Sequence, residues 1–107
     1  MVVELDRDTY EKNTIESREP VLVDFWGEDC APCLALNPAV EQFEKDFNGR
    51  LKVTKVNARQ NRMLCARLRV MSLPTFILYK DGSEIKRVTG EMITARYLRE
   101  TIEQALD

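Results

Sequence analysis

Two cysteines separated by two residues, Cys30 and Cys33, are the side chains of this 107-residue chain best suited to covalent chemistry. A pair with this spacing can close a small disulfide and reopen it, which is redox chemistry. The thiolate is the nucleophilic form of cysteine, and a free thiol has a pKa of about 8.5. Because the chain has no histidine, the commonest general base is missing, and the thiols need another source of activation.

The cysteine pair has two structural alternatives, half of a zinc site and a purely structural disulfide. Structural zinc takes four Cys or His ligands in most proteins, and this chain offers only one further cysteine, Cys65. We therefore expect no metal and no bound cofactor. Cys65 itself is predicted to be an inert buried thiol, with a regulatory or dimer-forming thiol as the alternative.

The elements around the pair predict where each thiol lies. Residues 21–26 are nearly all apolar, which indicates a central strand covered on both faces, and a helical pattern starts near Leu34. Cys30 then falls at the helix N-cap, where unpaired N–H groups and the helix dipole favour a negative sulfur. Pro32 suits the first turn. Cys33, one turn further, should be more buried, so we expect Cys30 to attack and Cys33 to resolve the mixed disulfide.

The remaining pattern predicts a single α/β domain over residues 1–107. Further strands are expected at residues 2–5, 51–57, 75–79 and 84–89, with a hairpin turn at Asp81-Gly82. One helix is capped by Asp6 or Asp8 and runs to about residue 17, a second is kinked at Pro38, and a third covers residues 60–69. Thr94 caps a fourth helix that has Tyr97, Leu98, Ile102 and Leu106 along one face. Helical crossovers imply parallel pairing first and the hairpin implies antiparallel pairing last, giving a mixed sheet.

Composition and charge limit the functional classes. The net charge is −2 with acids and bases mixed along the chain, so we expect no nucleic-acid partner. No apolar run approaches the length that spans a bilayer, so no membrane association is expected. The first residues lack the basic and apolar regions of a signal peptide, which predicts a cytoplasmic location, with a mature secreted form as the alternative. A monomer is expected.

The chain resembles the thioredoxin family in segments that are far apart in the sequence. The matching residues are Val23-Asp24-Phe25-Trp26, Cys30-Ala31-Pro32-Cys33, Pro38, Leu73-Pro74-Thr75, Gly82 and Gly90. The resemblance implies a thioredoxin fold, with a central five-stranded mixed sheet flanked by four helices. It also implies a protein-disulfide reductase that acts on protein disulfides and is re-reduced by a thioredoxin reductase.

The resemblance further implies that Asp24 is a buried acid–base group serving Cys33, with Lys55 on the adjacent strand as its partner. Burial would raise the pKa of this carboxyl toward neutrality, which suits proton exchange in a chain without histidine. The residues alone leave two alternatives open, an Asp24 that faces solvent at a strand end and an Asp24–Lys55 pair that is only structural.

A substrate-binding surface around the cysteines is also implied by the resemblance. Trp26 packs beside the active-site loop, Pro74 has a cis peptide bond and faces the cysteines, and the Leu73 backbone is free to pair with an extended substrate. The residues by themselves also fit a simple core aromatic at Trp26 and a proline that only starts a strand. The other residues assigned to the surface are Asp29, Ala31, Pro32 and Gly90.

Asp29 departs from the family pattern, which has tryptophan there, and so do Ala31, where glycine is usual, and Leu34, where a basic residue is usual. The added negative charge and the lost positive charge both disfavour the Cys30 thiolate, so its pKa should be higher than in typical members and the dithiol a better reductant. Drift at a tolerant surface position is the alternative. At the level of function, the alternatives are a disulfide oxidase or isomerase of the same fold and a non-catalytic binding module.

Overall fold

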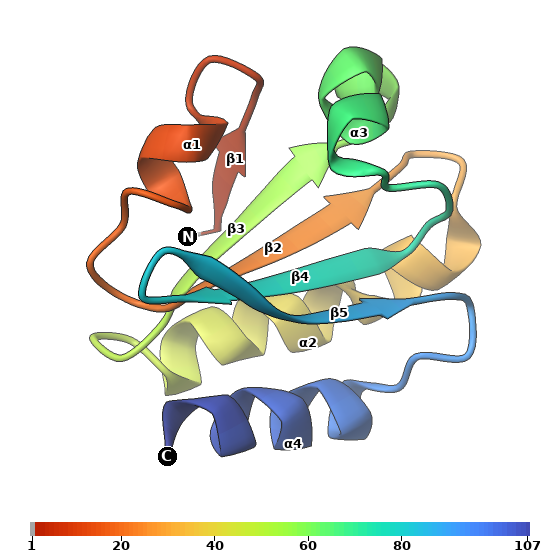
Figure 1. Ribbon diagram of the computed structural model, residues 1–107. Helices are drawn as coiled ribbons and strands as arrows, with labels where there is room; N and C mark the ends of the chain where they lie inside the picture. The colour runs from red at the N-terminus through yellow and green to blue at the C-terminus, as the bar shows by residue number, and fades with distance from the viewer. Residues whose placement is uncertain (1) are drawn as a thin grey trace.

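The computed structural model describes residues 2–107, so Met1 of the predicted domain lies outside the described residues. Five strands form one sheet in the order β1-β3-β2-β4-β5 (Figure 1). β3 pairs in parallel with β1 and β2, whereas β4 is antiparallel to β2 and β5. The mixed sheet predicted from the sequence is therefore confirmed. The strands are β1 (Val3–Leu5), β2 (Val21–Trp26), β3 (Lys52–Asn57), β4 (Thr75–Lys80) and β5 (Ser83–Thr89).

Four α-helices flank the sheet, two on each face. Figure 1 shows α2 and α4 side by side along one face, with α1 and α3 on the other. A short 3-10 turn, η1 (Arg59–Asn61), leads into α3. No helix among residues 2–107 is long and apolar enough to cross a membrane. The helices are α1 (Tyr10–Asn13), α2 (Ala31–Asp46), α3 (Arg62–Leu68) and α4 (Ala95–Leu106).

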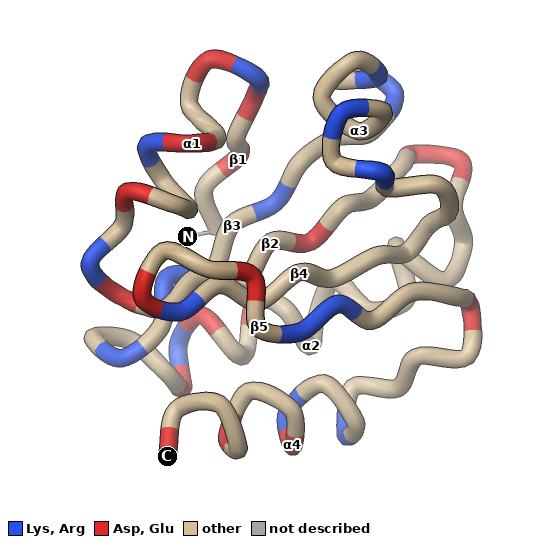
Figure 2. Tube along the Cα trace, in the orientation of Figure 1, with Lys and Arg blue, Asp and Glu red and all other residues tan. Residues whose placement is uncertain are grey.

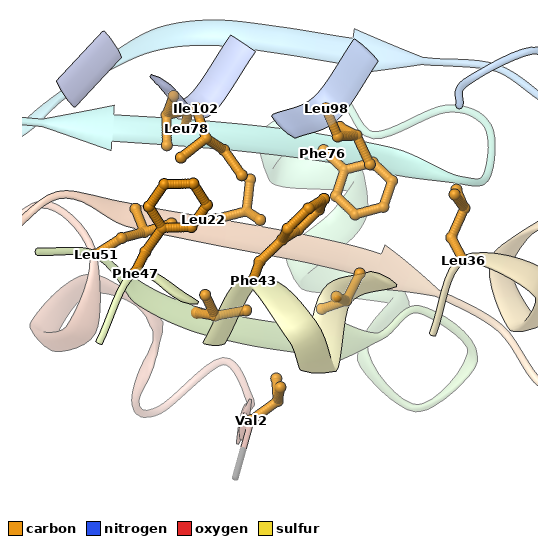
Figure 3. Packing of buried hydrophobic residues seen from close by; sticks show 12 residues of the cluster. Val2, Leu22, Leu36, Phe43, Phe47, Leu51, Phe76, Leu78, Leu98 and Ile102 are labelled. Carbon is orange, nitrogen blue, oxygen red and sulfur yellow. The ribbon is translucent and has the colours of Figure 1, made fainter. Parts of the chain in front are cut away.

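The sheet is covered on both faces by separate hydrophobic cores. Leu22 and Phe76 belong to the core under α2 and α4, where Figure 3 shows the Phe43 ring of α2 between residues of the sheet and residues of α4. Val23 and Phe25 belong to the core under α1 and α3. Because successive strand residues point to opposite faces, Asp24 and Trp26 lie on the α2 and α4 side with Leu22. β2 is thus the doubly covered strand that its apolar sequence predicts.

The first helix is shorter than predicted. It was expected to reach about residue 17 but ends at Asn13, because the backbone N–H groups of Thr14 and Glu16 both turn back to the Glu11 carbonyl. Neither predicted acid caps it. The Asp6 carboxylate accepts hydrogen bonds from the N–H groups just before the helix, and Thr9 is the N-cap without a side-chain bond.

The C-terminal half follows the prediction apart from one side chain. Asp81 and Gly82 have φ angles of 54° and 81°, as a tight hairpin turn requires. Thr94 caps α4 by accepting a hydrogen bond from the Tyr97 N–H at 3.1 Å. Of the residues predicted to share one face of α4, Leu98 and Ile102 are buried, whereas Tyr97 is 45% exposed. Tyr97 lies in the first turn of α4.

Candidate active site

The two cysteines lie at the N-terminal end of α2, just after the loop that follows β2. Cys30 is the N-cap of α2, and its Sγ accepts a hydrogen bond from the Cys33 N–H at 3.2 Å. Cys33 is only 1% exposed, whereas Cys30 is half-buried. Pro32 occupies the first turn of the helix, as expected. The predicted positions of both cysteines are therefore confirmed, with Cys30 partly exposed and Cys33 covered.

Cys30 and Cys33 form a disulfide in this structure, with their Cα atoms 5.2 Å apart. The structure thus describes the oxidised state of the pair. Cys65, on α3, is a free thiol in the buried position predicted for it, and burial raises its pKa. Among residues 2–107 no group of three or more His, Cys, Asp or Glu side chains is arranged to hold a metal ion.

Two other loops meet the cysteine loop. The Leu73–Pro74 peptide bond is cis, as the resemblance implied, and Pro74 is buried. Gly27 packs closely against Leu73, since a Cβ placed on this glycine would lie 3.1 Å from Leu73 Cδ1. Gly90, with φ of 113°, donates its N–H to the Pro74 carbonyl at 3.0 Å. The segment that holds Leu73 and Pro74 therefore packs against the cysteine loop on one side and is hydrogen-bonded to Gly90 on the other.

Asp24 is buried within β2 without a direct partner. It is 1% exposed, and neither carboxylate oxygen has a hydrogen bond. Burial is the main cause that raises its pKa, to about 7; Lys55 lowers the pKa and Glu4 raises it. The alternative of a solvent-facing Asp24 is therefore wrong. A carboxyl with a pKa near neutrality can both accept and release a proton under ordinary conditions.

Lys55 is the strand neighbour of Asp24 but not its ion-pair partner. The two residues are in register between β2 and β3, yet no nitrogen–oxygen contact within 4.0 Å joins them. The Lys55 Nζ instead lies 4.6 Å from the ring centroid of Trp26, a cation–π distance. The alternative of a purely structural Asp24–Lys55 ion pair therefore lacks the contact that defines it.

Asp29 is exposed and forms an ion pair that the sequence did not reveal. Its Oδ2 lies 2.7 Å from an Arg59 guanidinium nitrogen, and both side chains are mostly exposed. A pocket of about 390 Å³ opens beside Cys30, and its lining includes Asp29, Arg59, Arg62 and Leu73. The electrostatic effect expected of Asp29 on Cys30 assumed an uncompensated charge, and Arg59 removes that assumption.

Two residues near the site, Glu4 and Arg59, were missed by sequence reasoning. Glu4 follows Val2 in the alternation of the first strand, and it lies opposite Lys55 only because β1 pairs with β3. Arg59 comes two residues after β3 ends, so knowledge of which strand ends next to the cysteine loop would have identified it. Both signals needed the strand order, which the sequence alone does not specify.

The comparisons with known proteins agree with the geometry of the site. The sequence profile of the Thioredoxin family matches residues 1–104. A thioredoxin of Acetoanaerobium sticklandii is 41% identical over 92 residues, which cover 86% of this chain and 88% of the relative. A thioredoxin of Streptomyces clavuligerus is 38% identical over 86% of this chain and 85% of its own length. Thioredoxin 1 of Nostoc sp. is 33% identical, with 92% and 91% covered.

These relatives, the five-stranded sheet with four helices and the cysteine pair at a helix N-terminus all point to one reaction class. The chain has the thioredoxin fold, and its chemistry is thiol–disulfide oxidoreduction by dithiol–disulfide exchange. The oxidase, isomerase and non-catalytic alternatives are not favoured. The chain belongs to the thioredoxin family.

Proposed function

We propose that this protein reduces disulfides in other proteins, with Cys30 as the nucleophile and Cys33 as the resolving thiol. The observation that carries the proposal is the difference in exposure between two sulfurs that are close enough to bond. Cys30 is half-buried at the N-cap of α2, and Cys33 is covered one turn further along. A substrate disulfide can reach only the first of them.

The first step is an attack by the Cys30 thiolate on one sulfur of the substrate disulfide. The substrate S–S bond breaks, a new bond forms between Cys30 and the substrate, and the other substrate sulfur leaves as a thiolate and takes a proton. The backbone N–H of Cys33, which points at Cys30 Sγ, and the helix N-terminus stabilise the negative sulfur before attack.

The second step releases the substrate and is where Asp24 is proposed to act. Asp24 accepts the proton of the Cys33 thiol, and the resulting thiolate attacks Cys30 Sγ. The mixed disulfide breaks, the second substrate sulfur leaves and is protonated, and Cys30–Cys33 closes. Two electrons and two protons pass from the dithiol to the substrate. Support for this role comes from the burial of Asp24 and from its pKa of about 7.

The substrate surface is proposed to be the rim around Cys30. Its proposed members include Leu73, whose side chain lines the pocket beside Cys30, and Gly90, which is bonded to the Pro74 carbonyl. Pro74 and Trp26, whose ring centroid lies 4.6 Å from the Lys55 Nζ, are proposed members as well. The remaining proposed members are Asp29, Ala31 and Pro32.

The other proposals concern partners and setting. A thioredoxin reductase is proposed to return the electrons, and protein disulfides are the proposed substrates, as the family implies in general terms. We also propose that the protein acts in the cytoplasm as a monomer, with one domain over residues 1–107 and no cofactor.

The test is a trapping experiment in which each of the two cysteines is replaced by serine in turn. Cys33→Ser, in a Cys65→Ser background that removes the third thiol, should accumulate a covalent complex with a protein disulfide substrate. Cys30→Ser in the same background is the matched control and should trap none. Dithiothreitol should reduce the mixed disulfide and separate the complex into its two proteins. If Cys30→Ser traps substrate and Cys33→Ser does not, the two roles are reversed, and if neither traps, the chain is not a reductase of this kind.

A further inference from the structure

The face of the sheet beneath α2 and α4 holds a row of three ionisable residues, and the proposed mechanism uses only two of them. Glu4 of β1 is in register with Lys55 of β3, and Lys55 is in register with Asp24 of β2. In each strand the residue two positions earlier belongs to the core under α2 and α4, so all three side chains belong to that face. Figure 2 shows acidic, basic and acidic stretches on β1, β3 and β2 in this order.

Lys55 lies between the two acids and is bound tightly by neither. Its Nζ is over the Trp26 ring, and no ion pair within 4.0 Å connects it to either carboxylate. It nevertheless lowers the pKa of both Glu4 and Asp24. The larger cause raises both, and it is full burial at Asp24 but only partial desolvation at Glu4, which stays exposed. The charge of Glu4 in turn raises the pKa of Asp24. One ammonium thus serves two carboxylates.

No other charged side chain shares this environment among the described residues. The strand on the other side of β2 contributes Phe76 in register with Asp24. The buried residues of α4 are Leu98 and Ile102, and those of α2 are likewise uncharged, since Cys33 is held in the disulfide. The ionisation of Asp24 therefore depends on burial, on Lys55 and on Glu4.

We propose that Glu4 is a positioning residue for the release step, because its carboxylate attracts the Lys55 ammonium and limits how strongly that ammonium stabilises the ionised form of Asp24. The proposal rests on the proposed function, since only the exchange reaction gives the Asp24 proton a use. Glu4 is exposed on an edge strand and touches neither cysteine, so it acts through Lys55 and through the field at Asp24.

The expected effect has a definite sign. With Glu4 charged, Asp24 holds its proton to a higher pH, so both of its forms are populated near neutrality. Without that charge Asp24 ionises at a lower pH. Two strand spacings separate the residues, roughly 10 Å. At that separation Coulomb's law in a water-like medium gives a shift of about 0.3 pH unit, and a less polar medium gives more.

The experiment follows the carboxyl carbon of Asp24 by NMR during a pH titration of the oxidised protein. Glu4→Gln should lower the Asp24 midpoint by about 0.3 pH unit or more, and Glu4→Lys should lower it further. Glu4→Asp keeps the charge and should restore a midpoint near the wild-type value. Glu103→Gln, on the exposed side of α4, removes the same charge elsewhere and should leave the midpoint in place. Single-turnover release from the mixed disulfide should show its pH inflection shifted in the same order.

An unchanged or higher Asp24 midpoint in Glu4→Gln overturns the proposal, and so does an equal shift in Glu103→Gln, which would make the effect one of net charge. The titration uses the free protein and needs no activity. If the release rate is unchanged in Asp24→Asn, the proposed role of Asp24 in the reaction is refuted, but the titration result still holds. A failure of the Glu4 proposal and a failure of the proposed function are therefore distinguishable.

Discussion

Two aspartates flank the Trp26 end of β2, and their surroundings are opposite. Asp24 is buried, has no hydrogen bond to its carboxylate and has a cation nearby but not in contact. Asp29 is exposed and holds Arg59 at 2.7 Å. The acid with the better ion pair is the one that water screens, and exposed pairs contribute little to stability. Burial of the carboxylate, rather than the distance to its cation, therefore decides which of the two acids has the larger effect on stability.

The largest predicted effect is the loss of Asp24. Its pKa is raised from 3.8 to about 7, so ionisation opposes folding, and wild-type stability should fall as the pH rises from about 4 to above 7. At about 1.36 kcal/mol per unit, the full effect is on the order of 4 kcal/mol. Asp24→Asn should abolish this dependence and be more stable than wild type at pH ~8. Urea unfolding at several pH values measures both.

The same variant should slow the release step, because Cys33 loses the proposed proton acceptor. General acid–base groups contribute typically 10²- to 10⁴-fold, so a loss of about tenfold or more is expected at neutral pH. Cys30 attack, measured as formation of the mixed disulfide, should change much less. Equal slowing of both steps would mean that Asp24 acts on the fold of the site rather than on Cys33.

An intermediate effect is predicted for Lys55→Met. Since the Lys55 ammonium lowers the pKa of Asp24, its removal should move the Asp24 midpoint above the wild-type value. This is the opposite direction to Glu4→Gln. The NMR titration measures the midpoint, and the fluorescence of Trp26, the single tryptophan, should change as the cation leaves its ring. A downward shift would contradict the assigned order of charges.

The smallest effects belong to the exposed pair. Asp29→Asn and Arg59→Gln should each change the free energy of unfolding by less than about 1 kcal/mol. Asp29→Asn leaves a positive charge beside Cys30 and should favour its thiolate; Arg59→Gln should disfavour it, and the double variant should return toward wild type. Ultraviolet absorbance of the thiolate during a pH titration of the reduced protein measures these shifts.

Salt separates the two regions further. The differences among the Asp29 and Arg59 variants should shrink at about 1 M salt, where the screening length is roughly 3 Å. The Asp24 midpoint is set mainly by burial and should move little. A large salt dependence at Asp24 together with none at Asp29 would reverse the comparison.

The features that local sequence determines were predictable. The N-cap position of Cys30, the burial of Cys33 and the hairpin turn at Asp81 each depend on a few neighbouring residues, and the structure agrees. The prediction made the first helix too long. The residue pattern does not show that the N–H groups of Thr14 and Glu16 bond back to the Glu11 carbonyl and end the helix. The family resemblance supplied the cis bond at Pro74.

The partners of the two acids were harder to predict, because they come from strand order. Glu4 lies opposite Lys55 only since the first strand pairs with the third, and Arg59 approaches Asp29 only because β3 ends beside the cysteine loop. The placement of Lys55 over Trp26, rather than against Asp24, follows from packing on one face of the sheet. Such cross-strand contacts have no local signature.

Asp24 is proposed to accept the proton of Cys33 because burial raises the pKa of its carboxyl to about 7. The most direct test of this claim is the pH titration of the Asp24 carboxyl carbon in the oxidised wild-type protein, assigned by its loss in Asp24→Asn. The predicted midpoint is about 7. A midpoint near the 3.8 of an ordinary aspartate would contradict the claim.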